Sequence, residues 1–224
     1  GVNSADLLTI YACDIARLAG WEQHVWAAHN VPPEGKVSRE LLASQIRAQP
    51  ASTHAVEELL FVSMRKLEKG FERKFGAKLF KHQIDDGSAM QQISRFHCRD
   101  QASLLRLAKE IIRVFSDRLN LRELRKLSSH AEKDKLGSNK LLQDVLAKKI
   151  GEERARQVFG PIVGAYDLRV GDAHPTSSKI GDALELAGID ESQSYLRQGE
   201  QLIHNVGYSV WCIGKLLFEE KGNP

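Results

Sequence analysis

The spacing of the apolar residues is the feature that most limits what this chain can fold into. Large apolar side chains return every three or four positions in one segment after another, as at Leu104, Leu107, Ile111 and Phe115. This period places them on one face of an α-helix, whereas a half-buried β-strand needs strict alternation. No such alternation persists for more than a few residues. We therefore predict an all-α protein, a multi-helix bundle built as one body or as two packed helical lobes.

The same periodicity gives the expected order of elements. It predicts helices over residues 4–30, 53–75, 101–118, 140–150, 178–187 and 191–220. Glycine and proline predict interruptions at Gly151, at Gly160-Pro161, at Gly164 and in a turn over residues 170–178. We place the division between the two lobes after the helix that ends at residue 118. The expected domains are an N-terminal lobe, 1–118, and a C-terminal lobe, 119–224.

Composition excludes several classes of protein. The 224 residues are 42% hydrophobic, which is enough to bury a core. The three cysteines, Cys13, Cys98 and Cys212, are far apart and odd in number, so we expect reduced core thiols in a cytoplasmic protein and no disulfide framework. The most apolar stretch, residues 202–218, is too short and too polar to span a bilayer, so we predict no membrane partner.

Motifs that hold cofactors are missing from the sequence. It contains no HExxH or CxxC spacing for a metal, and no Walker A or GxGxxG loop for a nucleotide. We therefore predict neither a metal site nor a cofactor.

The charge is concentrated in the middle of the chain. Residues 61–160 carry a formal charge of +10, although the whole chain carries only +3. Central helices of this charge can face a polyanion such as RNA; alternatively, the acidic ends pack near the basic middle and offset it. Few aromatic residues interrupt the basic segment, so the sequence does not support a stacking platform for single strands.

One short segment combines three side chains that can carry chemistry. Arg169, Asp172 and His174 lie within six residues at the expected end of a helix. An arginine can hold a phosphate through two hydrogen bonds, and a histidine can take or give a proton near neutral pH. Together they are the minimum needed to cleave RNA without a metal. The other interpretation is a helix C-cap, in which both cations favour the helix dipole and Asp172 is a local salt-bridge partner.

The segment resembles the R-x4–6-H signature of HEPN domains. The resemblance covers this motif and the all-helical setting. It implies a helical bundle of the kind found in toxin or defence ribonucleases, in which arginine and histidine from two protomers meet across a dimer interface. The family often has Asn, Asp or His directly after the arginine, where this chain has Val170. Asp172 is then the candidate for that polar role.

The R-x4–6-H spacing occurs five times in the sequence, so we choose the candidate catalytic pair by the residues that surround each copy. We favour Arg169–His174 for its turn and for Asp172, and place Arg125–His130 second because it opens a polar, lysine-rich loop. The predicted RNA-binding residues come from that loop and the helix before it. They are Arg125, Lys126, His130, Lys133 and Lys135.

The working hypothesis is a metal-independent ribonuclease, a cytoplasmic homodimer that uses Arg169, Asp172 and His174. The alternative is a non-catalytic helical interaction or dimerisation domain of a larger bacterial protein. A first residue other than methionine, Gly1, and the two acidic ends fit that alternative equally well.

Overall fold

The computed structural model describes residues 1–49, 55–81, 92–130, 135–171 and 177–218. The chain divides into two compact units, Gly1–His54 and Ala55–Pro224. The expected division at residue 118 instead falls inside the second unit. The reason is packing: α6 (Gln101–Phe115) and α9 (Glu152–Gly171), one on each side of residue 118, contact each other and share a core.

The first unit holds little regular structure. Its helices are α1 (Ala12–Ile15), α2 (Gly20–Ala28) and α3 (Arg39–Leu41), which continues as a π-helical turn, η1 (Leu42–Ile46). The single helix expected over 4–30 is therefore wrong for residues 4–11 and is interrupted at residues 16–19. Asn3 Oδ1 accepts the backbone N–H groups of Ala5 and Leu7, each at 2.9 Å, and a side chain that captures nearby amides competes with helix formation.

Polar contacts hold the first unit together. Within residues 1–49 no apolar side chain is fully buried, and the two buried residues are Asn3 and Ser38. Asn3 Nδ2 donates to the carbonyl of Glu34 at 2.7 Å, which ties the start of the chain to the turn before α3. The buried apolar core lies in the second unit, between Leu60 and Leu217.

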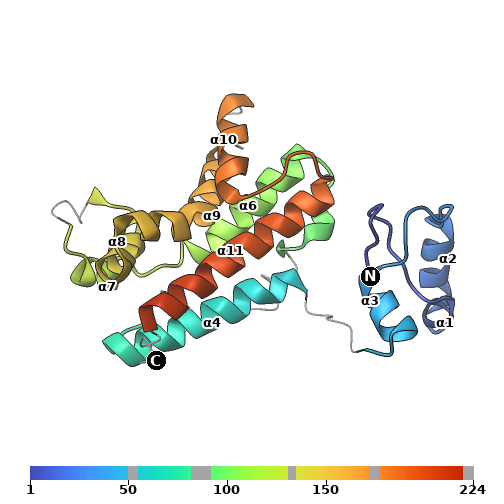
Figure 1. Ribbon diagram of the computed structural model, residues 1–224, viewed down its shortest axis with the longest axis horizontal. Coiled ribbons are helices and arrows are strands. Elements are labelled where there is room, and N and C mark those ends of the chain that lie inside the picture. The colour runs from blue at the N-terminus through green and yellow to red at the C-terminus, as the bar shows by residue number, and fades with distance from the viewer. Residues whose placement is uncertain (50–54, 82–91, 131–134, 172–176, 219–224) are drawn as a thin grey trace. The chain divides into compact units, whose positions relative to one another are not determined.

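The second unit is a bundle of helices (Figure 1). In chain order its elements are α4 (Val56–Phe75), the 3₁₀ turn η2 (Arg95–His97), α6, α7 (Leu121–Leu127), α8 (Ser138–Ile150), α9, α10 (Ser177–Ala187) and α11 (Tyr195–Phe218). The described residues contain two isolated β-bridges and no strand, which confirms the all-α prediction. Within the same residues, no helix combines the length and the apolar character needed to cross a bilayer.

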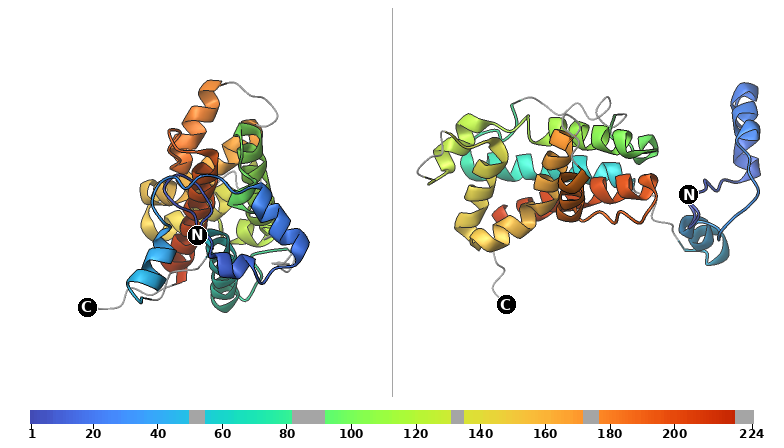
Figure 2. Two further views of the ribbon diagram at one scale, coloured as in Figure 1. Left: turned by 90° about the vertical axis from the view of Figure 1, so that its right-hand side faces the viewer. Right: turned by 90° about the horizontal axis from the view of Figure 1, so that it is seen from above.

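Helices α4 and α11 form the most extensive contact and run in parallel, side by side in Figures 1 and 2. Gly207 faces the backbone of Leu60, and further along both helices Gly214 faces Leu67. A Cβ atom at position 207 would lie 3.1 Å from the backbone nitrogen of Leu60. The glycine therefore lets the two backbones approach closely. Parallel pairing also brings the C-terminal ends of both helices to the same end of the bundle.

Helix α9 passes through three of the expected interruptions. Gly151 does end a helix, with φ of 86°, but Gly160, Pro161 and Gly164 all lie inside α9. The prediction of breaks at these three positions is wrong because neighbouring helices hold α9 there. The Ser209 hydroxyl donates to the carbonyl of Val158 at 2.6 Å, just before the proline. Gly164 lies directly against α10.

Substitution of Gly164 tests this helix contact. A Cβ atom there would lie 2.5 Å from the backbone nitrogen of Ala187 and 2.7 Å from the carbonyl oxygen of Ala183. We expect Gly164→Ala to lower the free energy of unfolding by about 1–3 kcal/mol, because backbone atoms cannot move aside. Urea denaturation followed by circular dichroism measures the change.

Gly160→Ala is the matched control in the same helix. Its Cβ would meet atoms of Leu186 at 3.5 Å, an ordinary van der Waals distance. It should leave stability unchanged or raise it by up to about 1 kcal/mol through helix propensity. Equal effects of the two substitutions would contradict a close contact specific to Gly164.

Candidate functional site

Arg169 lies in the last turn of α9, with its side chain 32% exposed. Its Nη1 atom donates to both carboxylate oxygens of Asp117, each at 2.9 Å. Asp117 comes two residues after α6 and is itself 44% exposed. These hydrogen bonds raise the pKa of Arg169 above its ordinary value. The structure thus supplies a carboxylate partner for Arg169 that is 52 residues away in the chain.

The ion pair occupies only one nitrogen of the guanidinium group. Nε and Nη2 of Arg169 have no hydrogen-bond partner among the described residues. An adjacent pair of guanidinium N–H groups can bind two oxygens of one phosphate. Asp117 therefore orients Arg169 without occupying that pair of donors.

The other two predicted catalytic residues, Asp172 and His174, lie outside the described residues. The predicted constellation of Arg169, Asp172 and His174 therefore stays a prediction. Around it, α9 continues to Gly171 and α10 begins at Ser177.

The predicted RNA-binding residues lie at and after the end of α7. Arg125 and Lys126 are in its last turn, and Lys126 forms an ion pair with Glu123 at 2.7 Å. His130 and Lys135 are exposed, and Lys133 lies outside the described residues. The hydrogen bonds of Arg169 go to Asp117 and do not reach this group.

Several lysines of the basic segment have a structural role at helix ends. Lys74 and Lys149 donate to the carbonyl of Leu217 at 3.0 and 3.3 Å, where α11 ends. Lys148 donates to the carbonyl of Leu127 at the end of α7. Cations stabilise the partial negative charge of a helix C-terminus, so part of the basic charge is explained by folding alone.

A second group of cations faces a groove between α4 and α11, which we call the basic groove. Its volume is about 350 Å³. The lining residues are Ser63, Lys66, Lys69, Gly70, Arg73, Trp211, Gly214, Lys215 and Phe218. The lining includes four cations and no carboxylate among the described residues. Sequence reasoning did not identify this groove, although positions 66, 69 and 73 have the spacing of one helix face.

A stack of side chains follows the exposed face of α11 into the basic groove. The rings of His204 and Tyr208 are 6.2 Å apart, and those of Tyr208 and Trp211 are 5.4 Å apart. The ammonium group of Lys215 lies 4.9 Å from the Trp211 ring centroid. Tyr208 and Lys215 therefore both contact the Trp211 ring, which lies in the wall of the groove.

Ser63 lies in the wall of the basic groove and is 1% exposed. Its hydroxyl group has no hydrogen-bond partner in the described part of the chain. Leaving a buried hydroxyl unbonded costs about 1–3 kcal/mol, so such a group calls for an explanation.

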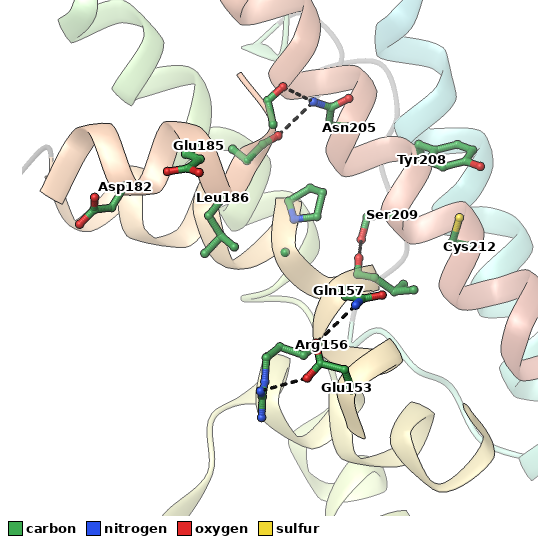
Figure 3. Close-up of a pocket in the computed structure, with 15 residues that line it drawn as sticks. Glu153, Arg156, Gln157, Asp182, Glu185, Leu186, Asn205, Tyr208, Ser209 and Cys212 are labelled. Carbon is green, nitrogen blue, oxygen red and sulfur yellow. Dashed lines mark hydrogen bonds and ion pairs between the residues drawn. The ribbon is translucent and has the colours of Figure 1, made fainter. Parts of the chain in front are cut away.

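A larger groove lies between α9, α10 and α11, and we call it the α10 groove (Figure 3). Its volume is about 1020 Å³. Asn205 Nδ2 donates to the carbonyls of Ala187 and Gly188 at 3.0 and 2.9 Å and so fixes the end of α10 on α11. Leu186 and Tyr208 line this groove and are 44% and 52% exposed.

The cysteines differ in their surroundings. Cys13 is exposed and Cys212 is half-buried, so the expectation of core thiols holds only for Cys98. Burial, together with the nearby charge of Asp100, raises the pKa of Cys98 to about 12. No cluster of three or more potential metal ligands occurs among the described residues.

Comparison of the chain with models of known protein families, with curated proteins and with solved structures found no match.

Thiol labelling tests the assignment of Cys98 as an inert core residue. At pH 8 we expect iodoacetamide to modify Cys13 first, Cys212 more slowly and Cys98 only after unfolding, because the thiolate is the reactive form and a pKa of about 12 keeps Cys98 protonated. Peptide mass spectrometry over a time course identifies each site. Labelling of Cys98 at the rate of Cys13 in the folded protein would rule out this burial.

Proposed function

We propose that this chain is a metal-independent, HEPN-like ribonuclease that acts in the cytoplasm, in a toxin or defence context. The observation that carries the proposal is the state of Arg169. Asp117 holds its guanidinium group at the surface with Nε and Nη2 open among the described residues, five positions before His174 in the sequence. An arginine held in this way can bind a phosphodiester through its other N–H groups, and His174 is the imidazole that we propose for proton transfer.

The proposed reaction is an internal transfer at phosphorus. The ribose 2′-oxygen bonds to phosphorus as His174 takes its proton, and the bond from phosphorus to the 5′-oxygen breaks. The leaving oxygen receives a proton, and the products are a 2′,3′-cyclic phosphate and a 5′-hydroxyl. Arg169 balances the negative charge that grows on the phosphoryl oxygens. Asp172 is the candidate for the polar residue that HEPN domains often have directly after the arginine.

The resemblance to HEPN domains also supports a homodimer. In such a dimer, His174 of one protomer accepts the 2′-hydroxyl proton, and His174 of the partner subunit protonates the leaving oxygen. A shared site therefore supplies both an acid and a base, which a single histidine cannot provide at the same moment.

Cleavage of RNA in EDTA tests the proposed function. We expect the purified protein to cleave a single-stranded RNA, and His174→Ala or Arg169→Ala to lower the rate at least about 100-fold, since each removes a group acting in the transition state. Asp117→Asn should lower the rate less, because the remaining amide still hydrogen-bonds the guanidinium group without its charge. Product analysis should find the cyclic phosphate.

His24→Ala is the matched control, because Arg17 and His24 also fit the R-x4–6-H motif but lie in the first unit. Its rate should equal that of the unmodified protein. Cleavage by His174→Ala at the full rate would refute the assignment of the catalytic histidine.

A second candidate function is a non-catalytic dimerisation domain. The observation that favours it is the α10 groove, because exposed Leu186 and Tyr208 give it an apolar surface. The occupant we infer for this function is a second copy of the chain, since dimerisation is also what the HEPN resemblance implies.

The oligomeric state tests this second candidate. We expect analytical ultracentrifugation to show a dimer for the unmodified chain and a monomer for Leu186→Lys, because a buried unpaired charge opposes association. Lys179→Glu, an exposed change on the same helix but outside the groove lining, should leave the dimer intact. A monomer at every concentration would contradict this function.

A further inference from the structure

The basic groove carries an inference that goes beyond the cleavage site. Helix capping explains the cations at one end of it, because Arg73 lies in the last turn of α4 and Lys215 in the last turn of α11. It does not explain Lys66 and Lys69, which lie two turns or so before the end of α4. The effect of the helix dipole fades within the last turn.

Lys66 and Lys69 also lack partners in the structure. Both are exposed, and neither has an ion-pair or hydrogen-bond partner among the described residues. Two carboxylates of the same helix are engaged elsewhere: Glu57 accepts the backbone N–H of Arg95, and Glu68 accepts that of Leu79. Four cations thus converge on one groove with no acidic side chain in its described lining.

Ser63 adds an independent observation in the same groove. Its buried hydroxyl group has no partner, and it lies one helical turn before Lys66 on the lining face of α4. A hydroxyl donor and several ammonium groups around one small volume are the groups that proteins use to bind phosphate oxygens. Gly70 and Gly214 add no side chains to the lining.

We propose that the basic groove is a phosphate-binding site. Lys66, Lys69 and Arg73 supply the positive charge, Lys215 closes the groove from α11, and Ser63 donates its hydroxyl to a phosphate oxygen. If the chain is the ribonuclease proposed above, the phosphate belongs to the backbone of the RNA substrate, and this part of the inference rests on that function. The groove then holds the strand at a site separate from the reacting phosphodiester at Arg169.

The fluorescence of Trp211 gives a local measurement of binding. The chain has three tryptophans, and the other two, Trp21 and Trp26, lie in the first unit. In the full chain with Trp21→Phe and Trp26→Phe, Trp211 is the sole indole. We expect its emission to change as inorganic pyrophosphate or an RNA oligonucleotide is added, with sodium chloride of equal ionic strength as the control titration. RNA is titrated into the His174→Ala form in EDTA, so that the strand stays intact.

Substitutions in the groove should weaken this binding. We expect Lys66→Gln with Lys69→Gln to raise the dissociation constant for either probe about tenfold or more. For RNA it should also reduce the slope of log affinity against log salt concentration by about 1.4, or 0.7 for each lost phosphate contact. Ser63→Ala should weaken binding about threefold or more without lowering the melting temperature, because it removes an unsatisfied hydroxyl.

Lys140→Gln with Lys179→Gln is the matched control. Both lysines are exposed, lie on other helices, have no partner among the described residues, and give the same change in charge. The proposal would be overturned if the groove variant and this control bound the probes with equal dissociation constants. The absence of any Trp211 response to both probes would also overturn it.

The remaining outcomes separate the groove from the proposed function. Groove-dependent RNA binding by a protein that cleaves no RNA supports the groove and refutes the ribonuclease. Groove-dependent binding of pyrophosphate without binding of RNA supports a phosphate site for a small phosphorylated molecule and refutes RNA as its ligand.

Discussion

The parallel contact between α4 and α11 is the constraint on which the second unit depends. Gly207 allows the two backbones to approach closely, and the buried faces of both helices contribute to one continuous core. Because the two helices run in the same direction, their partial negative ends lie together. Lys74 and Lys149 both donate to the carbonyl of Leu217 near the end of α11, which compensates the accumulated charge of the helix ends. The fold thus accounts for cations at this end of the bundle. It does not account for Lys66 and Lys69 of the basic groove, which lie further from the helix ends.

Arg169 and the basic groove differ in how their positive charge is held in place. Arg169 has a carboxylate partner, Asp117, that fixes its orientation while two of its nitrogens have no partner among the described residues. The cations of the basic groove are instead gathered by the packing of two helices, and Lys66 and Lys69 have no acidic partner in the described part of the chain. An arginine held in one orientation suits a reacting phosphate, whereas flexible lysines suit a backbone that slides and binds without sequence preference.

The spacing of apolar residues predicted the long helices well. It failed where a single side chain, or contact with a neighbouring helix, decided whether a segment is helical. The helices over 56–75, 101–115 and 195–218 follow directly from their apolar spacing. Residues 4–11 have a similar spacing, yet Asn3 captures two of their amides. Pro161 and Gly164 are helix breakers by themselves, but contacts with α11 and α10 hold α9 intact there. Of the predicted site, the structure describes Arg169, Arg125, Lys126, His130 and Lys135, and Asp172, His174 and Lys133 lie outside it.

By itself, the sequence determined that the protein is helical, where most of its long helices lie, and that its middle is basic. These properties depend on neighbours three or four positions apart, which the order of residues specifies directly. Only the tertiary structure decided that Arg169 meets Asp117, that the chain divides after His54, and that Lys66 and Trp211 line one groove. Each of these depends on which helix faces join across a long separation in the chain. That choice is made by the packing of the whole core, and no local spacing encodes it.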